Sequence, residues 1–175
     1  PRGGRQALRV GSVATLSRNF QFEFVRPALH RTNVEVIIRS GGFRELLLML
    51  HALQVDVVLS NQPALRDTET AWHSHLLAEQ PVSLVGAPQW KKKRLRFPED
   101  LGDLPMILPS LESNTRAGFD RLVAAAVVRP QIVAEVDDMA MLRLVARDSG
   151  WLTVLPEVVV QDELRTGVLV TVGQS

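Results

Sequence analysis

The sequence contains no cysteine among its 175 residues. This absence excludes disulfide bonds, thiolate catalysis and cysteine-based zinc sites, and it agrees with a reducing compartment, so we expect a cytoplasmic protein. Long apolar runs are also absent, since no stretch reaches the roughly 18 residues that span a bilayer. No apolar stretch follows the basic start of the chain, as a signal peptide would require. We therefore expect no membrane partner and no export.

The sequence also has almost no excess of positive over negative charge, since its net charge is only +1. The surface as a whole therefore does not attract nucleic acid. The sequence has no G-x-S-x-G elbow, no Walker loop and no G-x-G-x-x-G after the first apolar segment. His73 and His75 would lie on one face of a strand, but two ligands are too few for a metal site. The basic run at 91–96 is either a solvated loop or a phosphate-binding segment. We expect no enzymatic activity, no cofactor and no metal.

What the sequence does contain is an alternation of short apolar segments with helical ones, at 46% hydrophobic residues. The expected strands lie at 8–11, 34–39, 55–60, 72–78, 82–86, 106–108, 132–136 and 151–155, and the expected helices at 15–25, 43–53, 114–128 and 137–148. Strands that are nearly all apolar and are separated by helices predict a parallel sheet covered on both faces.

The stretch "ARDSGWLTVLPEVV" shows this alternation most clearly. Gly150 suits the left-handed conformation that ends a helix. The five residues "WLTVL" predict a central strand. Pro156 is expected at the first position of the next helix, where its missing N–H costs nothing.

Small polar residues end most of the expected strands, and in open α/β sheets ligands bind beyond the carboxyl ends of strands. These residues are Ser12, Ser40-Gly41-Gly42, Ser60-Asn61, Ser110 and Asp137-Asp138. Hydroxyls and free helix N–H groups suit a small anion or a polar metabolite. The same residue types also favour caps and turns, and for the two aspartates capping is the better interpretation, so both hypotheses stay open for the set.

Two expected helices are apolar on more than one face. The helix at 43–53 reads "FRELLLMLHAL", and the helix at 15–25 carries Phe20, Phe22 and Phe24. Such helices are either deeply buried or covered by a partner. Apolar surface left on an outer helix favours a dimer interface.

Six segments occur in a characteristic order: "LRVGS", "FRELLLMLHALQVDVVLS", "LLAEQPVSLVGAP", "FPEDLGDLPMILPS", "QIVAEVDDMAMLRLVARDSGWLTVLPEVVV" and "GVLVTV". Together they cover roughly residues 7–172 and resemble the effector-binding domain of LysR-type transcriptional regulators. Within that family, "VDVVLSNQP" and "AEVDDMAML" resemble the sodium-responsive antiporter regulators.

The resemblance implies an α/β, two-lobed type 2 periplasmic-binding-protein-like fold, in which each lobe is a mostly parallel sheet flanked by helices. Two crossover strands would join the lobes, with "EQPVSLV" leading out and "WLTVLPE" leading back. Lobe I would comprise residues 1–84 and 157–175, and lobe II residues 85–156. The family's N-terminal winged helix-turn-helix does not appear in this chain, so the resemblance implies DNA binding only through that missing domain.

The resemblance also implies an effector site between the lobes. Its recurrent positions correspond to Ser12, Val13, Ala14, Thr15, Ser40, Gly41, Gly42 and Ser110, and Ser60 joins them as the end of the third strand. Family dimers pack a first-lobe helix of one subunit against a second-lobe helix of the other. Here that arrangement implicates Phe20, Phe22, Phe24, Phe119, Leu122 and Val123.

We therefore expect the effector-binding and dimerisation domain of a transcription regulator, which senses a small polar or anionic molecule or ion. The full protein would be a homodimer or homotetramer. One alternative is the solute-binding protein of a transporter, which shares the fold but would carry an export signal. Another is an enzyme on the same fold, such as a deaminase, which would need a convergent set of acid, base or nucleophile.

Overall fold

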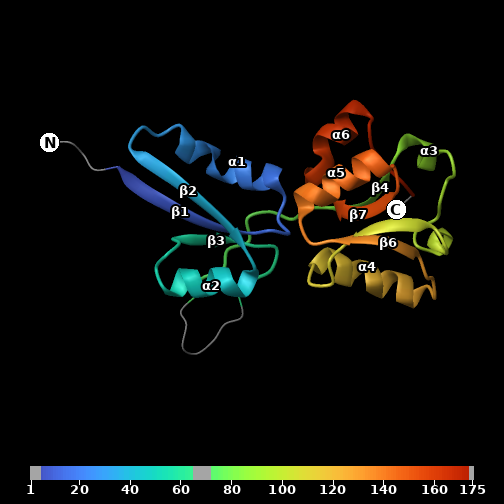
Figure 1. Cartoon of the computed structure of the whole chain (residues 1–175), viewed down its shortest axis with the longest axis horizontal. Coiled ribbons are helices and arrows are strands. Elements are labelled where there is room, and N and C mark those ends of the chain that lie inside the picture. Colours follow the sequence, from blue (N-terminus) through green and yellow to red (C-terminus); the bar gives the residue numbers. More distant parts are fainter. Residues whose placement is uncertain (1–4, 65–71, 174–175) are drawn as a thin grey trace. The chain divides into compact units, whose positions relative to one another are not determined.

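The computed structural model describes residues 5–64 and 72–173, and the chain forms two compact units, Pro1–Glu79 and Gln80–Ser175 (Figure 1). Each unit is built on one β-sheet, which confirms the predicted α/β class. No helix among the described residues is long and apolar enough to cross a membrane.

Unit 1 is a parallel three-stranded sheet between two helices. The strands β1 (Gln6–Val13), β2 (Val34–Gly41) and β3 (Val57–Leu59) lie in the order β2-β1-β3, and the helices are α1 (Arg18–Leu29) and α2 (Phe43–His51). Val10 packs with Val25 of α1 and with Leu59. A Cβ on Gly11, the next residue, would lie 3.0 Å from Leu46 of α2. Successive residues of β1 thus face opposite helices, as a strand covered on both faces requires.

The helix α1 begins and ends later than the sequence predicted. Its N-cap is Ser17, whose side chain accepts a hydrogen bond from the Phe20 N–H at 3.4 Å, so residues 15–17 precede the helix. The helix runs to Leu29 and contains Pro27. The proline therefore does not end the helix.

The strand predicted at 72–78 is wrong. Residues 72–80 have neither helix nor strand structure, and Leu76 and Leu77 are 82% and 57% exposed. Apolar composition alone does not make a strand when no neighbouring strand pairs with it and no sheet face buries its side chains.

Unit 2 is a mixed five-stranded sheet. Its strands β4 (Val82–Gly86), β5 (Pro105–Pro109), β6 (Gln131–Val136), β7 (Leu152–Pro156) and β8 (Val170–Thr171) lie in the order β6-β5-β7-β4-β8. The helices are α3 (Pro88–Lys91), α4 (Asn114–Ala125), α5 (Met139–Ser149) and α6 (Gln161–Thr166), with 3-10 turns at Glu99–Leu101 and Glu157–Val160. β5 runs parallel to β6 and β7, whereas β4 runs antiparallel to β7 and β8. β7 is the middle strand, as "WLTVL" predicted.

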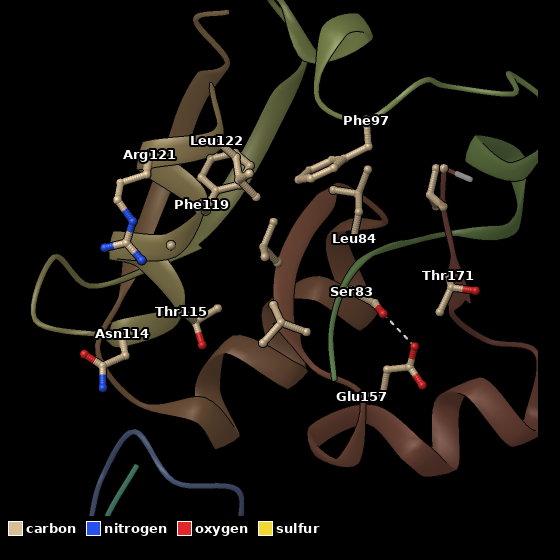
Figure 2. A pocket seen from close by; sticks show the side chains of 15 residues that line it. Ser83, Leu84, Phe97, Asn114, Thr115, Phe119, Arg121, Leu122, Glu157 and Thr171 are labelled. Atoms are coloured by element: carbon tan, nitrogen blue, oxygen red, sulfur yellow. Dashed lines mark hydrogen bonds between the residues drawn. The ribbon is translucent and has the colours of Figure 1, made fainter. Parts of the chain in front are cut away.

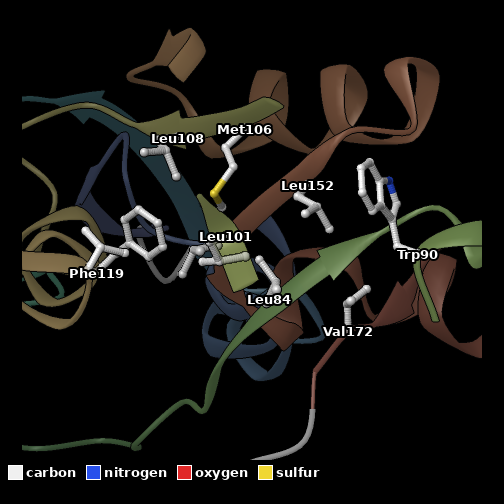
Figure 3. Packing of buried hydrophobic residues seen from close by; sticks show 10 residues of the cluster. Leu84, Trp90, Leu101, Met106, Leu108, Phe119, Leu152 and Val172 are labelled. Atoms are coloured by element: carbon white, nitrogen blue, oxygen red, sulfur yellow. The ribbon is translucent and has the colours of Figure 1, made fainter. Parts of the chain in front are cut away.

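Two apolar clusters cover the faces of this sheet. On one face Met106, Leu108 and Leu152 pack with Phe119 of α4 (Figure 3). On the other face a second cluster joins strand residues to α5 and to the turn after β7; it contains Val85, Ile107, Met139, Leu142, Ala146, Leu155, Val159, Val160 and Leu169. The sheet is therefore the centre of the unit's core.

Of the two residues predicted to bound β7, Gly150 has its predicted role and Pro156 does not. Gly150 has φ +68° and its N–H bonds the Ala146 carbonyl at 3.2 Å, so it is the predicted left-handed helix end. Pro156 is the last residue of β7 and precedes the 3-10 turn at Glu157, whereas the sequence placed it inside the next helix.

The division of the chain also differs from the prediction. The boundary falls between Glu79 and Gln80, and residues 157–175 belong to unit 2 instead of the first lobe. Val159 and Val160 are buried beside Leu155, and β8 pairs with β4. Burial of these apolar side chains and pairing along β4 hold the segment in unit 2, so β7 does not lead back to unit 1 within this chain.

Candidate functional site

The carboxyl ends of β1, β2 and β3 lie at one edge of the unit 1 sheet because the three strands are parallel. In the register of the sheet, Ser12 lies beside Ser40 of β2 on one side and Leu59 of β3 on the other. Since side chains alternate along a strand, Ser12 is on the same face as Val10, the face that α1 covers. The structure therefore brings two of the predicted serines together beneath α1.

Ser12 is fully buried, and its Oγ has no hydrogen-bond partner among the described residues. Buried hydroxyls are normally bonded, because an unpaired one loses its hydration without replacement. Ser12 thus leaves a donor and an acceptor unused at the end of the central strand of this sheet.

An arginine lies at the same edge. Arg18, the first residue of α1, donates a hydrogen bond from Nη1 to Ser40 Oγ at 3.2 Å. Both side chains are exposed. The positive end of the α1 dipole and a guanidinium therefore lie beside the serine pair, which favours a negatively charged or strongly polar group there.

The other predicted residues at this edge divide into two groups. Thr15 Oγ1 accepts a hydrogen bond from Asn61 Nδ2 at 3.3 Å, which adds a second polar pair. Ser60 instead forms a local turn, since its Oγ accepts from the Gln62 N–H at 3.0 Å and donates to the Gln62 carbonyl. Asn61 is a site residue that was not predicted, although it also lies at the carboxyl end of a predicted strand.

The backbone positions around these side chains have structural roles. Val13 is buried, and its carbonyl accepts from the Leu16 N–H at 3.0 Å in the turn that contains Ala14. A Cβ on Gly41 would lie 2.9 Å from the Glu45 carboxylate, so this glycine permits a close approach. Gly42 is the N-cap of α2.

In unit 2, Ser110 follows β5 at the edge where β5, β6 and β7 end. Its N–H donates to the Val136 carbonyl at 3.0 Å, and it lies in a hollow with the carboxylates Glu112, Glu135 and Asp137. This edge carries three carboxylates, whereas that of unit 1 carries Arg18 and the Glu45 carboxylate. Asp138 caps α5 by accepting from the Met141 N–H at 2.8 Å, as its position predicted.

Arg116 brings a positive charge to this edge, but that charge is paired within unit 2. It is 6% exposed, and its guanidinium bonds Asp120 at 2.9 Å, the Pro109 carbonyl at 3.0 Å and Glu135 at 3.2 Å. Its charge is used inside unit 2.

The residues predicted for a dimer interface also divide. Phe119 and Val123 belong to the core of unit 2, with 3% and 7% exposure, so both are removed from the predicted surface. Their position on the inner face of α4 explains the error, since the exposed Leu122 lies between them. Phe22 is exposed, Phe20 is half-buried, and Phe24 is half-buried against the cluster around Val10.

Within residues 5–64 and 72–173, no group of three or more histidine, aspartate or glutamate side chains is placed to hold a metal ion. The carboxyl groups whose pKa is shifted lie away from the serine edge. Hydrogen bonds from the Arg9 side chain lower the pKa of Asp56, and those from Arg96 lower the pKa of Asp100.

Comparisons with known proteins agree with this architecture. The regulatory domain of HypT M206Q from Salmonella typhimurium is similar in structure, with a TM-score of 0.76 and 18% identity over 98% of this chain and 83% of that one. The effector binding domain of QuiR in complex with shikimate gives 0.69 and 14%, over 98% and 82%. The regulatory domain of CcmR from Synechocystis PCC6803, in complex with 2-PG, gives 0.71 and 15%, over 95% and 79%.

The comparison with curated proteins found no match. The family described as LysR substrate binding domain matches residues 1–173, which is nearly the whole chain. The chain therefore belongs to the LysR substrate binding domain family, and its fold is the type 2 periplasmic-binding-protein-like fold of the regulatory domains of LysR-type regulators.

Proposed function

We propose that this domain senses a small polar or anionic effector at the carboxyl edge of the β2-β1-β3 sheet. The observation that carries the proposal is Ser12, a fully buried hydroxyl with no hydrogen-bond partner among the described residues. A bound group that bonds Ser12 would remove the cost of that unpaired hydroxyl. The complexes of QuiR with shikimate and of CcmR with 2-PG support a small-molecule effector for this chain.

The polar groups around Ser12 favour this chemistry. Ser40 and Arg18 supply a hydroxyl and a guanidinium, and the start of α1 supplies a positive dipole end. Thr15 and Asn61 supply a hydroxyl and an amide to the same edge. These are hydrogen-bonding groups for orientation and charge, and none of them forms a nucleophile and base pair, so we propose binding without catalysis.

We infer that effector binding regulates a cytoplasmic DNA-binding protein that is a homodimer or a homotetramer. DNA contact is assigned to an N-terminal winged helix-turn-helix domain outside this chain. The effector would shift the equilibrium between two states of the regulator by as much as its affinity differs between them. The exposed Phe22 on α1 and Leu122 on α4 are the residues that we assign to the dimer contact.

The test begins with a thermal-shift screen of small carboxylates, phosphates and polar metabolites, followed by calorimetric titration of the best ligand. Ser12→Ala should weaken binding by about 0.5–1.5 kcal/mol for a neutral ligand group and by up to about 3 kcal/mol for a charged one. The unliganded Ser12→Ala protein should be at least as stable as the parent, because the change removes an unsatisfied buried hydroxyl.

The matched control is Ser60→Ala, since Ser60 lies at the same edge but its hydroxyl is engaged in a local turn. This variant should bind the ligand as the parent does. Equal affinity of the parent and of Ser12→Ala would contradict the proposed site.

A further inference from the structure

A groove of about 600 Å³ lies within unit 2, between α4 and the strands β4, β7 and β8 (Figure 2). Its volume falls in the range of small-molecule sites. Its walls are largely apolar, and Leu84, Phe97, Phe119 and Leu122 converge on it. The residues that line it all belong to unit 2, so the groove is separate from the serine edge of unit 1.

One carboxylate lies in this apolar setting. Glu157, the first residue after β7, is half-buried, and its Oε1 accepts a hydrogen bond from the Ser83 hydroxyl at 2.6 Å (Figure 2). The ion pairs of the described residues do not include Glu157. Ser83 orients the carboxylate but brings no charge, so the negative charge of Glu157 is not neutralised by a protein cation.

The groove has one cationic side chain in its lining, Arg121 of α4. Arg121 is exposed, and it forms no ion pair with Glu157. Its charge is screened by solvent and salt, whereas that of the half-buried Glu157 is screened less. The part of the groove beside Glu157 is therefore complementary to a positive charge attached to an apolar body.

We propose that this groove binds a small apolar primary amine, whose ammonium group is held by Glu157 and whose hydrocarbon body packs against Phe97 and Phe119. The two rings have centroids 6.4 Å apart and a tilt of 37°, so they offer an aromatic wall to one side of a ligand. The ammonium donates to the carboxylate oxygens of Glu157, an interaction strengthened by the charge on both partners. This site is additional to the effector site proposed for unit 1 and does not depend on it.

Two substitutions separate this role from a purely structural one. Glu157→Gln keeps an amide oxygen that can accept the Ser83 bond between β4 and β7, but it removes the charge. Gly118→Leu fills the groove from α4, where an added Cβ would meet only the flexible end of Arg121, at 3.9 Å. Neither change disturbs a buried apolar side chain.

The experiment is an NMR titration of the chain with 2-phenylethylamine and with its neutral counterpart 2-phenylethanol, at neutral pH. The amine should bind about tenfold more tightly than the alcohol, since its ammonium group makes a charge-assisted hydrogen bond where the alcohol makes a weaker one. Glu157→Gln should bring the two ligands to equal affinity without changing the affinity of the alcohol. Gly118→Leu should abolish the binding of both.

Glu112→Gln is the matched control, because Glu112 is an exposed carboxylate of unit 2 outside the groove, and it should leave the preference intact. Equal binding of amine and alcohol by the parent chain would overturn the proposal. An amine preference that survives Glu157→Gln, or that disappears in Glu112→Gln, would overturn it as well. If Glu157→Gln does not fold, continued amine binding by a folded Gly118→Leu protein would still refute the site.

Discussion

The carboxyl edges of the two sheets hold similar residues but differ in what their arginines do. In unit 1, Arg18 is exposed and bonds Ser40, so its charge stands at the edge beside Ser12. In unit 2, Arg116 is buried and bonds Asp120 and Glu135, so its charge is offset within the unit, while Glu112 and Asp137 also line the hollow around Ser110. The location of an arginine near a strand end therefore does not decide its role. Burial and the partners it reaches decide whether the charge serves a ligand or the fold.

The largest expected effect concerns the exposed apolar residues that we assign to the proposed dimer contact. Phe22→Glu in unit 1 and Leu122→Glu in unit 2 should each raise the dimer dissociation constant. The free energy of dimerisation should become less favourable by about 2–4 kcal/mol if the residue lies at the centre of the contact. Sedimentation equilibrium measures this constant. Leu48→Glu on α2 is the control, since Leu48 is also exposed but has no assigned contact. A monomeric parent chain at high micromolar concentration would contradict the assignment.

The next effect separates the structural arginine from the exposed one. Arg116→Met should lower the free energy of unfolding by about 2 kcal/mol, because it leaves the Pro109 carbonyl and two carboxylates without their donor. The loss is moderated because both carboxylates are nearly half exposed. Arg18→Met should change stability by less than about 0.5 kcal/mol. Urea denaturation of the two variants measures both changes in unfolding free energy. Equal losses of stability would contradict the distinction between the two arginines.

A smaller effect tests which edge binds the effector. Arg18→Gln should lower the affinity for an anionic effector about tenfold, because it removes a charge-assisted hydrogen-bond donor while keeping a polar side chain. Glu112→Gln combined with Asp137→Asn at the unit 2 edge should leave the affinity nearly unchanged. Calorimetric titration distinguishes the two outcomes. If the double variant changes the affinity more than Arg18→Gln does, the effector is held by the acidic edge.

The smallest effect compares an exposed ion pair of each unit. Arg9 lowers the pKa of Asp56 in unit 1, and Arg96 lowers the pKa of Asp100 in unit 2. Because each carboxyl group has a lower pKa in the folded chain, the stability it contributes is fully present above about pH 4, the unfolded pKa, and is lost as pH falls through the folded pKa. Asp56→Asn and Asp100→Asn should each flatten the fall in unfolding free energy below pH 4. An unchanged acid dependence in both variants would show that neither pair is formed in solution.

Local pattern predicted the elements well where the pattern had a local cause. The helix 43–53 corresponds to α2, the strand 82–86 matches β4, and Gly150 ends α5 in the left-handed conformation. The strand predicted at 72–78 failed because strand formation needs a partner strand, which nothing within the segment encodes. The helix at 15–25 was displaced because Ser17, and not a residue before Thr15, caps it.

The candidate site was predictable only as a list of strand ends. The carboxyl-end rule selected Ser12 and Ser40, which parallel pairing brings side by side. It could not separate them from Ser60, whose hydroxyl is used in its own turn, since serine favours both situations. The sequence also could not show that Phe119 and Val123 face the core of unit 2. Helical periodicity identifies an apolar face of a helix but does not show whether the core or a second subunit covers that face.

The sequence by itself determined the alternation of buried strands and helices, the turns at glycines and caps, and through its ordered segments the family to which the chain belongs. Those features depend on neighbours within a few residues along the chain. Three features follow only from the tertiary structure. Residues 157–175 belong to unit 2, the Arg116 guanidinium is bonded within that unit, and the Ser12 hydroxyl is buried without a hydrogen-bond partner among the described residues. The physical reason is that strand pairing, burial and the reach of long side chains join residues far apart in sequence.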